Sequence, residues 1–306
     1  MKQSLLDRLL GGLVGGLLRL IGRADPDRAS TFCGTALRRV GPWLPQHRVG
    51  RENLRAAFPE KDAAWIEATL RGAWENLGRV AGEYVHLGRL WDFSLETAQT
   101  GRVRANPATI ALFDTLRDDG KPALVFAAHL GNWEFPALAA PAHRLPSAVV
   151  YRMPNNQAIA GRIAAIRSTL MGRLIRSRPE AVFEMAGALD QGLHLGMLVD
   201  QHFSRGVEIQ FFGRPCWANP TIARLARQFD CPVIGTRAIR LPGNRFQVDS
   251  IGPLDLPRDA AGKIDVKGAT QMINTIIEGW IREHPEQWLW FHRRWRLARP
   301  RRRRAG

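Results

Sequence analysis

Cysteine, lysine and long apolar runs are all scarce in this 306-residue sequence. The three cysteines, Cys33, Cys216 and Cys231, are odd in number and have no CxxC spacing, so neither a disulfide framework nor a zinc site is indicated, and a reducing compartment fits best. The longest stretch without an acidic or basic residue, Pro122 to Trp133, is well short of the roughly 18 to 20 apolar residues that a spanning helix needs. We therefore expect no transmembrane helix.

The charge balance, by contrast, is strongly basic. A net charge of +16 arises from 44 basic and 28 acidic residues. This excess favours an anionic partner, which could be nucleic acid, an anionic membrane surface or an acidic protein, and the sign of the charge does not choose among them. The hydrophobic content of 45% is that of a globular protein with a sizeable core, and it excludes a disordered or fibrous chain.

The first 25 residues show helical amphipathicity. Leucines recur at steps of three and four residues, namely Leu6, Leu10, Leu13, Leu17 and Leu20. Basic residues in the same segment could meet lipid phosphates while the leucines enter the acyl boundary, so we predict a membrane-interface helix over residues 1–25. A plain core helix would show the same leucine stripe. A cleaved signal peptide is disfavoured because Asp7 interrupts the basic start and no A-x-A site follows.

Sequence patterns typical of strands alternate with patterns typical of helices along most of the chain. Short runs rich in Val, Ile and Phe predict strands at 123–128, 148–151, 195–199, 232–239 and 246–251. Helical patterns predict helices at 62–91, 133–140, 156–171, 179–191, 220–229 and 266–283. This alternation predicts an α/β fold with a mixed, largely parallel sheet flanked by helices. We assign one domain to residues 26–298 and a basic tail to residues 299–306.

The sharpest local feature is the sequence HLGNWE at residues 129–134. It follows a predicted strand, so His129 should lie at the carboxyl end of the sheet, where α/β proteins form their ligand crevice. Asn132 is a natural N-cap for the next helix, which would put Glu134 in its first turn and near His129. A neutral histidine held by a carboxylate can remove a proton from a hydroxyl group.

Other interpretations of this feature remain open at this point. His129 could be a strand-end histidine with a capping partner, because HxxxxE has low specificity alone. A metal site is less favoured, since the spacing is not that of HExxH and no second histidine lies at ligand spacing. A serine hydrolase is disfavoured because the chain has no G-x-S-x-G sequence.

Further motifs make a family resemblance specific. They are NLRAAFP at 53–59, HLGNWE at 129–134, VYRMPNN at 150–156, DQH at 200–202, GV at 206–207, FFG at 211–213 and HPEQWLWFHRRW at 284–295. Together they resemble the lipid A late acyltransferases, the lauroyl and myristoyl transferases of lipopolysaccharide synthesis, within the lysophospholipid acyltransferase superfamily. The resemblance covers roughly residues 40–296 and implies a glycerolipid acyltransferase-like fold.

The resemblance implies transfer of a fatty acyl chain from acyl carrier protein to a hydroxyl group of a lipid A precursor, at the cytoplasmic face of the bacterial inner membrane. His129 would deprotonate the acceptor hydroxyl and Glu134 would orient His129. A thioester already activates the carbonyl carbon, so the expected reaction needs no metal, nucleotide or other cofactor. The expected partners are acyl carrier protein, anionic membrane lipid and the lipid A precursor, and not nucleic acid.

Four residues complete the predicted substrate site. Arg152 follows a strand, where its guanidinium would suit an acceptor phosphate, although a solvated arginine is the alternative. Asp200 also ends a strand and, with Gln201, could position Arg152 or an acceptor hydroxyl, and a buried structural pair is equally compatible. Asn132 could hold the active-site turn rather than touch substrate.

The C-terminal tryptophans and arginines allow several interpretations. Trp beside Arg is typical of a membrane interface, and it also suits nucleic-acid binding. Trp288 and Trp290 could instead be packed in the core. The competing functions are therefore acylation of another glycolipid or lysophospholipid and, more remotely, non-catalytic binding of nucleic acid, which would leave His129 and Glu134 unexplained.

Overall fold

The computed structural model describes residues 12, 15, 16, 18–153 and 157–295. The predicted membrane-interface helix at 1–25 falls largely outside the described residues, and the predicted tail at 299–306 falls wholly outside them. No helix within the described ranges combines the length and hydropathy needed to cross a membrane. Cys33, Cys216 and Cys231 are free cysteines, and the last two are buried.

A seven-stranded sheet forms the centre of the molecule, in the order β1-β9-β8-β2-β5-β3-β4. The strands are β1 Val103–Ala105, β2 Leu124–Ala127, β3 Ser147–Tyr151, β4 Arg173–Arg176, β5 His194–Leu198, β8 Val233–Leu241 and β9 Arg245–Ile251. Strands β8, β2, β5, β3 and β4 are mutually parallel, whereas β9 pairs antiparallel with β8 and parallel with β1. The predicted mixed, largely parallel sheet is thus confirmed.

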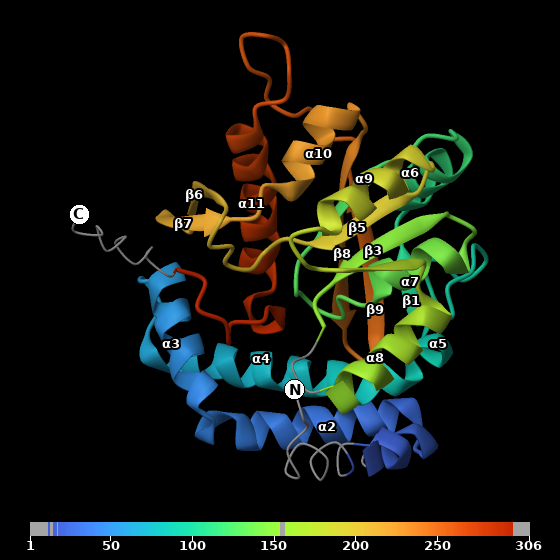
Figure 1. Ribbon diagram of the computed structural model, residues 1–306. Coiled ribbons are helices and arrows are strands. Elements are labelled where there is room, and N and C mark those ends of the chain that lie inside the picture. The colour runs from blue at the N-terminus through green and yellow to red at the C-terminus, as the bar shows by residue number, and fades with distance from the viewer. Residues whose placement is uncertain (1–11, 13–14, 17, 154–156, 296–306) are drawn as a thin grey trace.

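Helices cover both faces and one end of this sheet (Figure 1). They are α2 Pro26–Val40, α3 Pro45–Ala57, α4 Ala63–Glu83, α5 Leu87–Leu90, α6 Pro107–Asp118, α7 Phe135–Ala142, α8 Gln157–Leu170, α9 Ala181–Asp190, α10 Thr221–Phe229 and α11 Val266–Glu283. Three short 3-10 helices lie at Gly41–Trp43, Tyr84–His86 and Pro285–Gln287, and a separate hairpin is formed by β6 Val207–Phe211 and β7 Arg214–Ala218.

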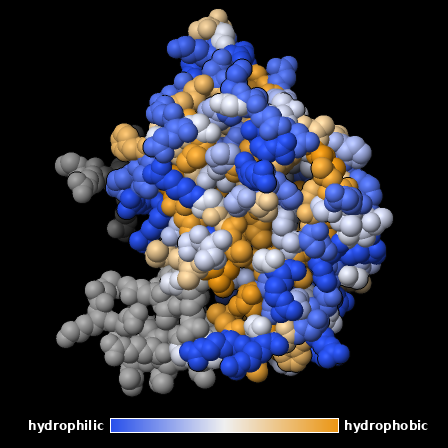
Figure 2. Space-filling view, turned by 90° about the vertical axis from the view of Figure 1, so that its right-hand side faces the viewer, coloured by the Kyte–Doolittle hydropathy of each residue, from blue (hydrophilic) through white to orange (hydrophobic). Residues whose placement is uncertain are grey.

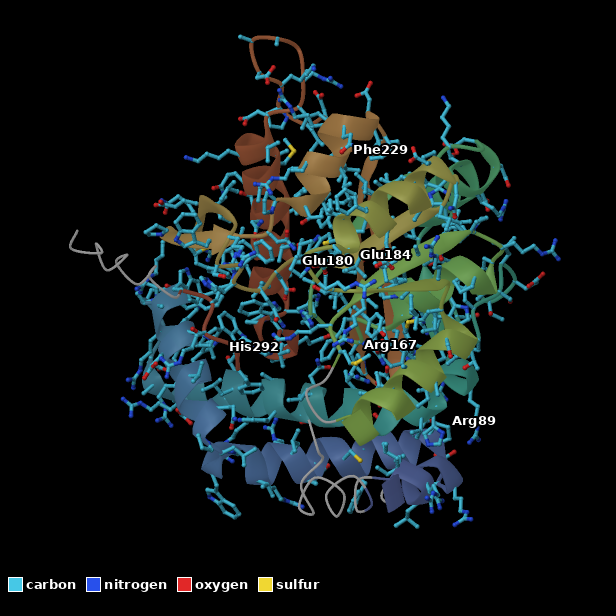
Figure 3. The ribbon with its side chains drawn as sticks, viewed as in Figure 1. Arg89, Arg167, Glu180, Glu184, Phe229 and His292 are labelled. Carbon is cyan, nitrogen blue, oxygen red and sulfur yellow. The ribbon has the colours of Figure 1, made fainter. Side chains whose placement is uncertain are left out.

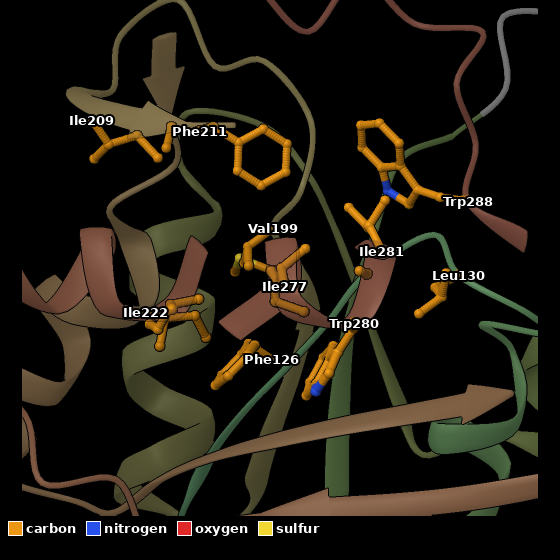
Figure 4. Close-up of a cluster of buried hydrophobic side chains, with 14 of the residues drawn as sticks. Phe126, Leu130, Val199, Ile209, Phe211, Ile222, Ile277, Trp280, Ile281 and Trp288 are labelled. Atoms are coloured by element: carbon orange, nitrogen blue, oxygen red, sulfur yellow. The ribbon is translucent and has the colours of Figure 1, made fainter. Parts of the chain in front are cut away.

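The largest core lies between the sheet and helices α9, α10 and α11. Phe126 of β2 stacks on Trp280 of α11 with ring centroids 5.7 Å apart, and Ile222 and Ile277 belong to the same buried cluster (Figure 4). Helices α5, α7 and α8 pack on the opposite face, where Phe135 meets Phe246 edge to face. The helices therefore form a layer on each side of the sheet, as expected for an α/β fold.

Helix α4 lies across the carboxyl end of the central strands, with α2 packed on its outer side (Figure 1). Asn76 of α4 is buried, and its amide donates hydrogen bonds to the carbonyl oxygens of Gly131 at 2.9 Å and Gln287 at 3.0 Å. These bonds attach the N-terminal helices to the loop that follows β2. The N-terminal layer thus supports the part of the molecule where His129 lies.

Candidate active site

The loop between β2 and α7 has a conformation that requires glycine at one position. Gly131 has φ +57°, and a Cβ atom there would lie 1.9 Å from the carbonyl oxygen of Ala238. The backbone N–H of Asn132 donates to that same oxygen at 3.1 Å, and the N–H of Leu289 donates to the carbonyl oxygen of His129, also at 3.1 Å. The loop is thereby fixed to β8 and to the C-terminal segment, which sets the position of His129.

Asp200, at the end of β5, is the carboxylate that holds His129. Its Oδ1 lies 2.8 Å from Nδ1 of His129, and its Oδ2 accepts hydrogen bonds from the backbone N–H of His129 at 2.9 Å and from the indole N–H of Trp288 at 2.8 Å. Burial by itself would raise the pKa of Asp200, but the attraction of His129 and the hydrogen bonds from His129 and Trp288 together lower it from 3.8 to about 2. Asp200 is therefore ionised at neutral pH.

This pairing sets the chemistry of the imidazole. When Nδ1–H of His129 donates to an ionised carboxylate, the lone pair of the neutral ring is on Nε2. The side chain of His129 is 19% exposed, so it borders both the core and the cavity described below. The amide nitrogen of Gln201 lies 3.4 Å from Nε2, at the long limit for a hydrogen bond. The arrangement can accept a proton from a group placed in the cavity.

Glu134 has a different partner from the one predicted. Its carboxylate accepts two hydrogen bonds from Arg167 of α8, from Nε at 3.1 Å and from Nη2 at 2.6 Å, and the described contacts include no hydrogen bond between Glu134 and His129. The guanidinium of Arg167 lies 5.8 Å from the ring of Tyr84, the residue that follows α4. Arg167 itself is labelled on α8 in Figure 3. The predicted task of orienting His129 is thus performed in the structure by Asp200, because β5 ends beside β2.

Asn132 is fully buried and supports the loop. Its side-chain oxygen accepts from the backbone N–H of Glu134 at 3.2 Å, and its amide donates to Glu83 at 2.8 Å. Glu83 also accepts 2.9 and 2.6 Å bonds from Arg240 and Ser30 respectively, so this buried carboxylate is a structural junction. The expectation that Asn132 caps α7 is wrong, because the helix begins at Phe135 and Glu134 takes the N-cap position. The turn-holding alternative for Asn132 agrees with its burial.

Arg152 and Asp200 do not form the pair that the sequence suggested. Arg152 is exposed at the rim of the cavity, whereas Asp200 is 1% exposed and bonded to His129. Trp288 and Trp290 are buried, which agrees with the packing alternative for these two residues. Arg167, Glu83 and the contact between Asp200 and His129 were missed, because nothing in their local sequence shows which distant strands and helices come together.

A cavity of about 1270 Å³ opens beside His129, and Glu134 and residues of β5 also border it. Its walls are mainly aliphatic, while exposed arginines stand at its rim, including Arg152, Arg178, Arg205 and Arg224. In the space-filling view, apolar surface gathers between hydrophilic margins on the side where α7 and α8 lie (Figure 2). An apolar chain and an anionic group could therefore be accommodated together. Within the described residues, no three His, Cys, Asp or Glu side chains group as metal ligands would.

Residues 4–297 match the family model described as bacterial lipid A biosynthesis acyltransferase, which covers almost the whole chain. No curated protein matches the sequence.

Proposed function

The chain belongs to the family of bacterial lipid A biosynthesis acyltransferases, and we propose that it transfers a fatty acyl group from acyl carrier protein to a hydroxyl group of a lipid A precursor, with His129 as general base. The observation that carries this proposal is the 2.8 Å contact between Nδ1 of His129 and buried Asp200 at an apolar cavity. It leaves the lone pair of Nε2, which meets only the long 3.4 Å contact from the Gln201 amide, to accept the hydroxyl proton where a hydrocarbon chain can lie.

The proposed reaction proceeds by direct attack. Nε2 of His129 takes the proton of the acceptor hydroxyl while its oxygen forms a bond to the thioester carbonyl carbon. The carbon–sulfur bond then breaks, and the thiolate of the carrier protein's prosthetic arm receives the proton from the imidazolium. Asp200 stabilises that imidazolium and fixes its orientation. Because the thioester is already activated, the proposal needs no covalent enzyme intermediate and no cofactor beyond the acyl donor.

Glu134 acts in this proposal through Arg167. The carboxylate holds two of the guanidinium donors and fixes the plane of the group. Arg167 borders the same cavity as His129, so its remaining N–H donors can stabilise the negative charge that develops on the thioester oxygen. Glu134 is then a positioning residue, and its removal should reduce turnover without removing the base.

The charges at the cavity rim suit both substrates. Arg152 has an exposed, planar guanidinium that fits a phosphate group of the acceptor lipid. The net charge of +16 favours encounter with acyl carrier protein, which is acidic as a class. These two anionic substrates explain the positive charge at the cavity rim without a nucleic-acid partner.

We propose that the protein rests on the cytoplasmic face of the inner membrane, and the outer side of α2 with the turn after it supports attachment to a lipid surface. Phe32 and, just after the helix, Trp43 are 72% and 82% exposed. Arg28 and Arg39 are exposed on the same stretch. Aromatic rings that sit at headgroup depth beside guanidinium groups are typical of a surface resting on anionic lipid.

The direct test is a transfer assay with purified protein, acyl-loaded carrier protein and a lipid A precursor dispersed in detergent. We expect mass spectrometry to show addition of one acyl group, and His129→Ala to lower turnover by about 100- to 10,000-fold with an unchanged melting temperature. Wild-type turnover by folded His129→Ala would disprove the base assignment. A parallel assay with a lysophospholipid acceptor tests the acceptor class, since a preference for that lipid would contradict the lipid A assignment alone.

A further inference from the structure

One face of the central sheet is incompletely covered. Strand residues that point to the core with α9, α10 and α11, such as Phe126 and Leu195, are fully buried. Their alternate neighbours Val125, Val149 and Gly196, which stand side by side on β2, β3 and β5, are only partly buried although these strands are central. All three border the cavity that contains His129. The cavity therefore extends along this face rather than ending at the carboxyl edge of the sheet.

Gly196 leaves open space in the part of the cavity that runs along this face of the sheet, which we call the channel. Only two heavy atoms outside its chain neighbours lie within 4 Å of a Cβ atom built there, the carbonyl oxygen of Ala148 at 3.8 Å and a methyl group of Val149 at 4.0 Å. Glycine in the interior of a strand weakens it and often marks a site that another group approaches closely. The absence of a side chain at this position leaves space directly over β5.

The far end of the channel is polar. Ser147 and His194 begin β3 and β5, are paired in register and border the same cavity. Among the described residues, the buried hydroxyl of Ser147 and the buried Nδ1 of His194 have no hydrogen-bond partner, and His194 is 4% exposed. Burial is also the main reason why the pKa of His194 is lowered, so the ring is neutral at neutral pH. Two such groups can hold a water molecule, which a hydrocarbon terminus would not displace favourably.

The length of the channel follows from strand geometry. His194 lies six positions before Asp200 on the same chain segment. At about 3.3 Å per residue this is about 20 Å along the sheet. A fully extended chain of single bonds advances about 1.2 Å per covalent bond. An acyl chain of roughly 16 bonds would therefore reach from the level of His129 to the polar end.

We propose that the donor acyl chain lies along this face of the sheet, that Gly196 provides its clearance, and that Ser147 and His194 form the polar end that limits its length. The proposal rests on the proposed function, because the thioester carbonyl must lie beside His129.

The test is a graded substitution series at Gly196, with Ala, Val and Leu, assayed against carrier protein loaded with saturated chains of increasing length. Gly196 lies two positions, about 7 Å, above the polar end, so Gly196→Leu should shorten the longest accepted chain by about five carbon atoms, and Gly196→Ala by less. Ser147→Ala combined with His194→Leu should instead extend acceptance by about two carbons. Gly187→Leu on α9 is the matched control, because a Cβ atom there meets nothing within 4 Å and it does not border the cavity.

A second readout separates this proposal from the transfer reaction. Free saturated fatty acids of graded length should raise the melting temperature of the wild-type protein, with affinity rising about fourfold per added methylene until the polar end is reached. In Gly196→Leu that optimum should move to shorter chains. Failure of acyl transfer with these shifts intact would overturn the proposed function alone. Unchanged length profiles in both assays, with all Gly196 variants folded, would overturn the channel.

Discussion

A substitution at Asp200 tests how much the reaction depends on the orientation of His129, because the imidazole itself stays in place. Asp200→Asn keeps the size of the side chain but removes the charge that fixes the imidazole tautomer and stabilises the imidazolium. We expect turnover to fall by about 100-fold or more while the protein still binds an acyl ligand. Steady-state rates measured beside ligand-induced melting shifts check this. If the Asn variant kept wild-type turnover, the carboxylate would have no part in the reaction.

The same residue makes a prediction about stability and pH. Because the folded protein lowers the pKa of Asp200 from 3.8 to about 2, the ionised form stabilises the fold, and this contribution is fully present above about pH 4. It is lost as the pH falls towards 2, and it amounts to roughly 2 kcal/mol. Denaturant unfolding at several pH values should show a shallower acid loss of stability in Asp200→Asn than in the wild type.

The pair formed by Glu134 and Arg167 predicts non-additive substitutions. Both side chains are largely buried, at 5% and 16% exposure. Glu134→Ala leaves a cation without its partner and should destabilise the protein by about 3 kcal/mol, whereas adding Arg167→Met should recover much of that loss. If Arg167 binds the thioester oxygen, the double variant should remain slow despite its recovered stability. Recovery of turnover together with stability would show a purely structural pair.

Arg152 is exposed, so its role can be tested without a folding penalty. Arg152→Lys keeps the positive charge but loses the planar, two-pronged donor set that matches phosphate. We expect a higher KM for the phosphorylated acceptor, an unchanged melting temperature and no effect on an acceptor lacking phosphate. Equal losses with both acceptors would mean that Arg152 does not read the phosphate.

The turn between β2 and α7 tests whether the loop sets the site. Gly131→Ala combines a positive φ with a Cβ atom 1.9 Å from a backbone oxygen, so both stability, by about 2 kcal/mol or more, and turnover should fall. Gly120 is the matched control, since it also has a positive φ of +68° but open space around its Cβ position. Gly120→Ala should lose some stability and keep wild-type turnover. Calorimetry and the transfer assay together distinguish these outcomes.

Strands and helices with strong apolar periodicity were predictable from the sequence. Elements that depend mainly on contacts with distant parts of the chain were not. The runs around Phe126 and Ile234 predicted the central strands correctly. Strand β4, which begins with Arg173 and ends with Arg176, was missed because charged ends mask a short edge strand. The sequence also located His129 correctly, but it assigned Glu134, the nearest acidic residue in the chain, as the carboxylate partner, because sequence spacing does not show contacts between distant strands. The true partner, Asp200, is brought in by parallel pairing of β2 with β5.

The apolar cavity with its basic rim and the exposed aromatic pair Phe32 and Trp43 lie on different elements of the molecule. Neither α2 nor the short 3-10 helix that follows it borders the cavity, yet this segment carries two of the most exposed large apolar side chains, Phe32 and Trp43. A lipid acceptor has to reach His129 from a membrane, and this exposed segment offers an attachment surface outside the catalytic loop. This separation makes attachment and chemistry independently mutable.

We predict that α2 contributes to binding of the full-length protein to vesicles containing anionic lipid. Phe32→Ser with Trp43→Ser should weaken vesicle binding about tenfold or more, because each aromatic ring can bury 150 Å² or more at about 25 cal/mol per Å². Salt should weaken binding further, since charge attraction is screened over about 10 Å at 0.1 M. Turnover on detergent-dispersed acceptor should persist.

Phe183 of α9 is the control residue for this vesicle-binding experiment, which measures the protein that sediments with the vesicles. It is 78% exposed and lies on a helix that packs against the sheet, away from α2. Phe183→Ser removes a similar exposed ring, so it controls for loss of apolar surface as such. If vesicle binding followed Phe183 rather than Phe32 and Trp43, the membrane would meet the molecule at α9, and the α2 assignment would be wrong. Because neither α2 nor Phe183 touches His129, either result leaves the proposed proton transfer to be decided by its own assay.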